Sequence, residues 1–339
     1  MIVETQFHQH ATMAEAKRNG AVVALLLALL VWSSITLSGS TSGALNPYAS
    51  LRHAGDVWCL AFSHDGAWLA AGADGPGGGG EVWLWDVGHK KRVLTLKQAA
   101  FVHAFAFSRQ GSILACGHDD GKVNLWDVRN GQSQGAFSGG NAVKALSFSP
   151  DDKLLAVADA DGKVTVWNVE TATPKQTLQA SRNYAFAVVF SPDGKTLATG
   201  GDYDGCVKLW NTRNWHAIRT LVGHNETVDA LAFSSDGKWL ASGSWDDTAK
   251  LWNVATGEVV CTMRGHTFNV WTVAFSPDSR LLATVSEEVA LWTIPNGVRR
   301  ALLPDENSAA VAFSPDGRTV ATAKDATVHL WRTQRILKR

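Results

Sequence analysis

A tryptophan recurs at a nearly fixed interval along most of this 339-residue chain, and this constrains the fold more than any other feature. Successive positions are 39 to 43 residues apart, and each tryptophan follows a short alternating run such as VWLW or VKLW. The seven positions are Trp85, Trp126, Trp167, Trp210, Trp252, Trp292 and Trp331. An interval of about 40–45 residues with several short strands per unit is typical of propeller blades. Helical repeats would instead alternate with a period near 3.6 residues.

A second signature precedes each tryptophan: a strand that ends in a tight turn, written AFSPDG in its fullest form. Its seven copies begin at residues 61, 106, 147, 189, 232, 274 and 312. In such a turn Pro presets φ, Asp caps the turn and Gly accepts a positive φ. Together the two signatures predict an all-β, seven-bladed propeller over residues 48–338.

The balance of charge argues against a nucleic-acid partner. The chain carries 31 basic and 31 acidic residues, whereas nucleic-acid-binding domains carry a basic surface that neutralises phosphates. The four cysteines fall in different repeats without CxxC spacing, and the sequence has no phosphate-loop or metal motif. We therefore expect no cofactor and no bound metal. The sequence carries no signal for an oligomeric state.

Residues 21–37, AVVALLLALLVWSSITL, form the one long apolar run without charge. Lys17 and Arg18 precede it and no basic residue follows until Arg52, which predicts a cytoplasmic N-terminus and export of the rest. The run predicts one N-terminal hydrophobic helix, as the apolar region of a cleaved signal peptide or as an uncleaved signal anchor. A cytoplasmic tail at 1–20 and a flexible linker at 38–47 would flank it.

Two consequences follow for the N-terminal part. The tail is long for a signal peptide, and a start at Met13 instead of Met1 would give a more ordinary one. We expect the propeller to be extracytoplasmic, either secreted or periplasmic or anchored with the propeller outside. Membrane contact would be made only through residues 21–37, if they stay uncleaved.

The repeats resemble the WD-repeat family over about 290 of the 339 residues. At the seven repeat tryptophans, the dipeptide that gives the family its name stands only at residues 85–86 and 126–127, and Trp-Asn replaces it in the next three repeats. The resemblance implies four-stranded antiparallel blades. It also implies a buried hydrogen-bonded tetrad in each blade, made of a His, a Ser or Thr, a turn Asp and the strand Trp.

The tetrad carries over unevenly from repeat to repeat. The fifth repeat matches throughout, with His224, Ser242, Asp246 and Trp252. The sixth lacks the turn Asp, the first replaces the Asp turn with a glycine-rich loop, and in the seventh Pro304 stands where the family has His. Because a buried polar network stabilises only when every member is satisfied, we expect blade 5 to be the most rigid and blades 1 and 7 the loosest.

Closure of the ring has two candidates. In the resembled family the N-terminal strand completes the last blade, and Ala49–Arg52 aligns with the outer strands of later repeats. The rival is Thr333–Lys338 at the other end of the chain. Closure matters because an open sheet edge promotes aggregation.

The resemblance places partner contacts on one propeller face, at three positions in each repeat. Mapped by motif, the positions with aromatic, His or acidic side chains that we take as a partner-binding face are Trp58, Phe101, His103, Tyr184, Phe186, Tyr203, Asp229, Trp245 and Trp271. Interface hot spots favour Trp and Tyr, which predicts a non-catalytic scaffold for a protein or peptide. The alternatives are a propeller enzyme with a channel-centred site, for which His103, Lys144 and Asp229 are the reactive candidates, and a sensor or regulatory subunit of a larger membrane-associated assembly.

Overall fold

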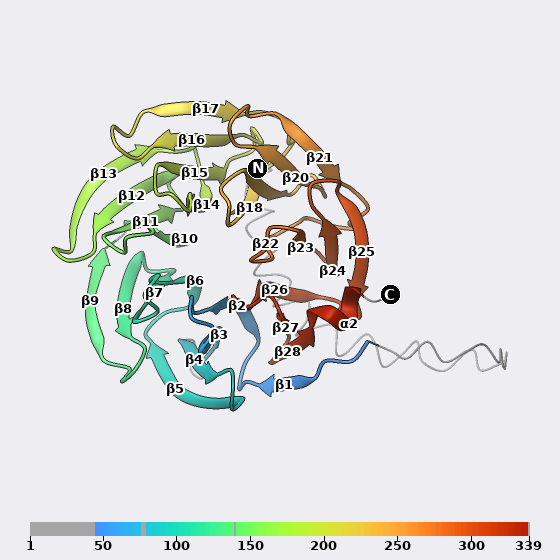
Figure 1. Ribbon diagram of the computed structural model, residues 1–339. Coiled ribbons are helices and arrows are strands. Elements are labelled where there is room, and N and C mark those ends of the chain that lie inside the picture. The colour runs from blue at the N-terminus through green and yellow to red at the C-terminus, as the bar shows by residue number, and fades with distance from the viewer. Residues whose placement is uncertain (1–44, 76–78, 139, 338–339) are drawn as a thin grey trace, which may run out of the picture. The chain divides into compact units, whose positions relative to one another are not determined.

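The alternating segments form short strands that are grouped four by four around a central axis (Figure 1). The computed structural model describes residues 45–75, 79–138 and 140–337, so the predictions for the tail, the apolar segment and most of the linker lie outside the described residues. Each sheet is antiparallel and runs outward from an inner strand to an outer strand at the rim. The sequence-based expectation of seven four-stranded blades is therefore confirmed.

Six blades are built from consecutive strands. Blade 1 contains β2 (Val57–Phe62), β3 (Trp68–Asp74), β4 (Gly80–Asp86) and β5 (Lys91–Gln98). Blade 2 contains β6 (Val102–Phe107), β7 (Ile113–His118), β8 (Lys122–Asp127) and β9 (Ser133–Ser138). Blade 3 contains β10 (Val143–Phe148), β11 (Leu154–Asp159), β12 (Lys163–Asn168) and β13 (Thr173–Gln179).

The second half follows the same order. Blade 4 contains β14 (Ala185–Phe190), β15 (Thr196–Gly201), β16 (Val207–Asn211) and β17 (Ala217–Leu221). Blade 5 contains β18 (Val228–Phe233), β19 (Trp239–Ser244), β20 (Ala249–Asn253) and β21 (Val259–Met263). Blade 6 contains β22 (Thr272–Phe275), β23 (Leu281–Val285), β24 (Val289–Thr293) and β25 (Val298–Leu303).

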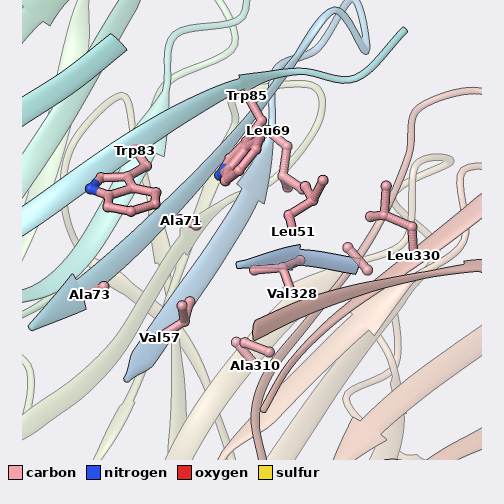
Figure 2. Close-up of a cluster of buried hydrophobic side chains, with 12 residues drawn as sticks. Leu51, Val57, Leu69, Ala71, Ala73, Trp83, Trp85, Ala310, Val328 and Leu330 are labelled. Carbon is pink, nitrogen blue, oxygen red and sulfur yellow. The ribbon is translucent and has the colours of Figure 1, made fainter. Parts of the chain in front are cut away.

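Blade 7 is built from both ends of the chain. It contains β26 (Ser308–Phe313), β27 (Thr319–Lys324) and β28 (Thr327–Arg332), and its outer strand is β1 (Ala49–Arg52). In the register of β1 against β28, Ala49 lies opposite Leu330. Figure 2 shows Leu51 of β1 packed between Leu330 of blade 7 and Leu69 of blade 1.

Closure by Ala49–Arg52 is thus confirmed, and closure by Thr333–Lys338 is wrong. Because β1 occupies the outer edge of β28, no edge is left for a second closing strand. Residues Thr333–Leu337 instead form the helix α2, in which Ile336 is buried against the blade 6 and blade 7 core. No helix in the described ranges is long and apolar enough to cross a membrane.

The turns between the first and second strands bear out the glycine argument. In this turn Gly66 and Gly194 have φ values of +73° and +69°, a region that glycine enters at no steric cost. Where the sequence has Asp152 or Ser279 at this position, the residue still adopts a positive φ, of 60° and 58°. The shape of the turn is therefore set by its other residues and not by glycine alone.

In blade 5 the four predicted side chains form one hydrogen-bonded chain. The indole Nε1 of Trp252 donates to Ser242 Oγ at 2.8 Å, and Ser242 Oγ lies 2.7 Å from His224 Nε2. His224 Nδ1 lies 2.9 Å from a carboxylate oxygen of Asp246. Burial lowers the pKa of His224, so a neutral ring donates from Nδ1 and accepts from the serine. Burial opposes ionisation of Asp246, but hydrogen bonds from His224 and Thr248 outweigh it and hold the pKa of that carboxyl low.

Blade 7 contains a network that sequence reasoning missed. Trp331 Nε1 donates to Thr322 Oγ1 at 2.8 Å, and the threonine hydroxyl donates to the Asp305 carboxylate. His329 Nδ1 lies 3.0 Å from the other oxygen of Asp305. An acid one residue after Pro304 thus takes the place of the missing histidine, and His329 on β28 takes the place that the turn acid has in the blade 5 network. Blade 7 therefore has a buried network although Pro304 stands where the family has His.

The hydroxyl that receives the tryptophan N–H is present in four blades and absent in three. The β-sheet register places Thr199, Ser242, Thr284 and Thr322 at this point in blades 4 to 7. At the same point blades 1 to 3 have Ala71, Cys116 and Val157. In blade 1 the indole of Trp85 reaches His53 directly, at 3.2 Å. The indole nitrogens of Trp126 and Trp167 are buried without a hydrogen-bond partner among the described residues.

Candidate partner-binding face

The side chains of the expected binding face begin where each inner strand enters its blade. In six of the seven described inner strands the register shifts by one residue at this point, as it does at Trp58 in β2 and at Phe186 in β14. The residues left out of the pairing are Trp58, His103, Lys144, Phe186, Asp229 and Ala309. An unpaired residue at a β-bulge bends the strand and re-aims its side chain, and such bulges are frequent next to functional sites. These bulges were not predicted from the repeat pattern.

One group of face residues lies on blades 1 and 2. The rings of Trp58 and Phe101 meet edge to face with centroids 6.2 Å apart, and Phe101 meets His103 in the same way at 4.9 Å. The indole Nε1 of Trp58 donates to Asp74 Oδ1 at 3.0 Å, which fixes the plane of the ring. Asp74 at the end of β3 was not among the predicted site residues.

Next to these rings lies a cluster of polar side chains from blades 2 and 3. His103 Nε2 lies 2.5 Å from Asp119 Oδ1 and 3.5 Å from the ammonium of Lys144. Burial lowers the pKa of Lys144, and the carboxylates of Asp119 and Asp229 partly offset this effect. Burial raises the pKa of the Asp119 carboxyl, but the hydrogen bond from His103 and the charges of His103 and Lys144 together outweigh burial, so that this pKa is lowered. The ammonium therefore stands among acids that favour its charged form.

The second group lies on blades 4 and 5. Tyr184 and Phe186 have ring centroids 5.4 Å apart, and Phe186 lies 5.6 Å from Trp245, which follows β19. The indole Nε1 of Trp245 donates to Asp229 Oδ2 at 3.2 Å. Tyr203, near Tyr184, has 44% of its surface exposed. Five of the nine predicted face residues are thus brought into one neighbourhood.

Trp271, in blade 6, contacts neither of these groups in the ring contacts of the described residues. Its ring meets Phe268 edge to face at 6.4 Å, and Phe268 is 39% exposed. Blade 6 is also the blade whose inner strand pairs without a register shift. Phe268 was missed in the sequence because it lies in the loop before β22, outside the three motif positions.

The face carries acids and a single His beside a Lys, but few of the groups that catalysis needs. His103 is engaged by Asp119 and Lys144, and no serine, threonine or cysteine hydrogen-bonds its ring in the described part of the chain. Within the same part, no three His, Cys, Asp or Glu side chains converge as metal ligands. The arrangement offers ring surfaces and carboxylates to a binding partner.

Seven four-stranded blades around a central axis define a β-propeller. The profile of the WD domain, G-beta repeat, matches seven segments: residues 45–86, 88–127, 131–168, 172–211, 215–253, 257–288 and 306–332. The chain therefore belongs to the WD-repeat family. A search of curated proteins found no match. Propellers of this family generally serve as protein-interaction scaffolds and are typically not catalytic.

Proposed function

We propose that this propeller is a non-catalytic scaffold that binds a protein or peptide through the aromatic face formed by Trp58, Phe101, His103, Tyr184, Phe186, Tyr203, Asp229, Trp245 and Trp271. The observation that carries the proposal is the bulge that leaves a large or charged side chain out of the strand pairing in five consecutive blades. Bulges weaken the strand pairing locally, so their repetition at one face favours a role for the side chains that they re-aim.

The aromatic rings on this face are well suited to a protein partner. Trp58, Phe186, Trp245 and Trp271 are half-buried, so each keeps a ring surface in contact with solvent. Aromatic side chains bury a large area and lose little conformational entropy on binding, because they have only two side-chain torsions. Hot spots at protein interfaces are enriched in such residues.

The test is capture of a partner from the native extract with the full-length protein as bait. The double variant Trp58→Ala with Trp271→Ala should lose the captured protein and keep its melting temperature within about 3 °C. The matched control is Val222→Ser, which changes a side chain 70% exposed just after the outer strand β17, and it should capture normally. Undiminished capture by the double variant would contradict the proposal, as would a large drop in its melting temperature.

We extend the proposal to location: the propeller lies outside the cytoplasm, behind the apolar segment 21–37. The support is the charge asymmetry around that segment, with Lys17 and Arg18 ahead of it. Alkaline phosphatase fused after residue 50 should be active, because the enzyme requires export. An inactive fusion that is present at normal amounts would overturn the proposed location.

A further inference from the structure

Three rings and one carboxylate on blades 4 and 5 form a compact group, which we name the aromatic–acid cluster: Tyr184, Phe186, Trp245 and Asp229. The two ring pairs are tilted, with interplanar angles of 34° and 45°, and not stacked face against face. All four side chains are half-buried. Phe186 lies on β14 and Asp229 on β18, and Figure 1 shows these two inner strands on neighbouring blades. Tyr184 directly precedes β14 and Trp245 directly follows β19, so the cluster joins blades 4 and 5.

The chemistry of the cluster is complementary to an organic cation. The face of an aromatic ring carries the negative part of its quadrupole and attracts ammonium and guanidinium groups, with indole the strongest of the three ring types. The hydrogen bond from Trp245 Nε1 to Asp229 Oδ2 places a carboxylate at the edge of that indole. A cation over the rings would thus interact with both the ring faces and a full negative charge in partly desolvated surroundings, where both attractions strengthen.

The other ring group, Trp58, Phe101 and His103 on blades 1 and 2, is less suited to binding a cation. It also has an indole held by a carboxylate, since Trp58 donates to Asp74. Its neighbour Phe101, however, contacts His103, and the Lys144 ammonium lies 3.5 Å from His103 Nε2. A cation from a partner would meet like charge there. The aromatic–acid cluster has no basic side chain among its own members.

Lys144 interacts electrostatically with acids of both ring groups, Asp119 beside His103 and Asp229 of the aromatic–acid cluster. Its ammonium interacts favourably with the carboxylate of Asp229 as well as with that of Asp119. Lys144 is thus the chain's own cation near the acid of the cluster, and it weakens the attraction of Asp229 for any other cation. Removal of Asp229's charge and removal of Lys144's charge should therefore change cation binding in opposite directions.

We infer that the aromatic–acid cluster is a subsite for a cationic side chain, a guanidinium or an ammonium, carried by the partner segment. The inference rests on the proposed function and deepens it, because it names the chemistry that the face recognises. Ring faces hold the alkyl stem and the cationic head, and Asp229 supplies the opposite charge.

The experiment titrates the full-length protein with short capped peptides and follows the tryptophan indole N–H resonances. The probes are Ac-Gly-Gly-Arg-Gly-Gly-NH2 and its uncharged citrulline counterpart, with a Lys and norleucine pair as the second arm. The arginine or the lysine peptide should bind about three- to tenfold more tightly than its neutral counterpart and should shift the Trp245 indole signal. The arm with the larger ratio identifies the head group.

Three variants test the assignment. Asp229→Asn keeps an acceptor for the Trp245 N–H but removes the charge, and it should bring the charged-to-neutral ratio close to one. Phe186→Leu keeps an apolar contact without a ring face and should lower the ratio about threefold. Lys144→Met should raise the affinity for the cationic peptide about threefold. Asp74→Asn is the matched control beside the other ring group and should leave the ratio unchanged.

Equal affinity for charged and neutral peptides would overturn the inference, and so would a Lys144→Met variant that weakens binding of the cationic peptide. Failure of the inference is distinguishable from failure of the proposed function. If neutral and charged peptides bind equally and still shift the indole signals of the face, the face binds peptides without cation recognition. If the face variants leave partner capture intact, the proposed function itself fails.

Discussion

Blades 4 to 7 and blades 1 to 3 share one backbone design but bury their tryptophans differently. In the first group the indole N–H of each repeat tryptophan meets a hydroxyl on the neighbouring strand, at 3.0 Å for Trp210 and 2.8 Å for Trp292. In the second group the equivalent positions are Ala71, Cys116 and Val157, which offer no oxygen. The fold survives in both, so burial of the ring forms the blade. The polar link adds stability and fixes the ring's orientation.

The difference also separates two ways in which a buried network can vary. Blade 7 replaces both of the network's charged positions and keeps the link through Asp305 and His329. Blade 2 instead rebuilds a network around Gln98, whose Oε1 lies 2.9 Å from His118 Nε2. That network leaves the Trp126 indole nitrogen without a partner among the described residues. In blades 2 and 3, where the hydroxyl is missing, the tryptophan N–H has no partner among the described residues, whereas in blade 1 His53 accepts it directly.

The largest effect is expected where the link is complete. His224→Ala in blade 5 removes the partner of both Ser242 and Asp246, and leaves a buried carboxylate short of a hydrogen bond. We expect a loss of about 4 kcal/mol in the free energy of unfolding, measured by denaturant titration. Gln98→Ala, at the end of β5 and in contact with His118 of blade 2, is the matched change and should cost about 1 kcal/mol. Equal losses in the two blades would remove the distinction between the two halves.

Acid should weaken both halves, because each contains a buried histidine whose pKa is lowered to about 4. Burial and the charge of Arg92 lower the pKa of His53 in blade 1 from 6.5 to about 4, and burial and Arg299 lower that of His266 in blade 6 to about 4. Between pH 6.5 and pH 4 the unfolded chain binds more protons than the folded one, so the free energy of unfolding decreases as the pH falls through this range. Each histidine should account for up to about 3 kcal/mol of that loss.

Unfolding measured across this pH range tests the expectation. His53→Gln and His266→Gln each keep an acceptor for the adjacent side chain and remove the titrating ring, so each should flatten the pH dependence by a similar amount. An unchanged slope in either variant would show that its histidine is not protonated on unfolding.

Removal of the Ser242 hydroxyl should make blade 5 resemble blades 1 to 3, which lack a hydroxyl at this position. Ser242→Ala leaves the buried N–H of Trp252 and Nε2 of His224 without their shared partner. The expected loss is about 2 kcal/mol, measured by thermal or denaturant unfolding. Ser242→Thr restores the hydroxyl found in blades 4, 6 and 7 and should recover most of that loss. A neutral Ser242→Ala would mean that the indole N–H gains another partner.

The smallest expected effect is a gain. Val157→Thr replaces a methyl group with a hydroxyl of nearly the same size, at the position that Ser242 has in blade 5. In blade 3 this hydroxyl could accept from the indole nitrogen of Trp167, which has no partner among the described residues. We expect an increase of about 0.5–1 kcal/mol in the free energy of unfolding, seen as a higher melting temperature. Val157→Ala, which removes the methyl groups and supplies no hydroxyl, should lower it. A destabilised Val157→Thr would show that ring orientation differs between the two halves.

The repeat pattern predicted the blades, their turns and their closure because each depends on local chemistry. The Ser-Pro-Asp-Gly turn, the alternating strands and the likeness of Ala49–Arg52 to later outer strands are all visible in the sequence. The Asp305 network was hidden because its acid and its histidine lie at positions shifted from the family pattern. The bulges at Trp58 and Phe186 were hidden because register is a property of two paired strands and not of one.

The motif positions predicted which side chains make up the proposed face, but not which of these side chains contact each other. Motif spacing gives the position of each side chain within its blade, and it says nothing of which rings meet across blades. The contact of Phe186 with Trp245 and the separation of Trp271 from both groups depend on how far each loop projects. Asp74 was missed because a glycine-rich loop replaces the family's Asp turn in the first repeat, and Phe268 was missed because it lies in the loop before β22.

Closure by β1 has a consequence for the order in which the chain folds. The hydrogen bond between Tyr48 and Thr319 joins residues 271 positions apart, and it belongs to the same blade as the final strand. During synthesis from the N-terminus, β1 is the first strand made and the last to find its partner. Blade 7 stays incomplete until residue 332 has emerged. Long-range pairing of this kind is slow, because a large loop must close before any contact is gained. For most of the synthesis β1 therefore has no partner strand, and this unpaired strand is the surface that a folding chaperone would have to cover.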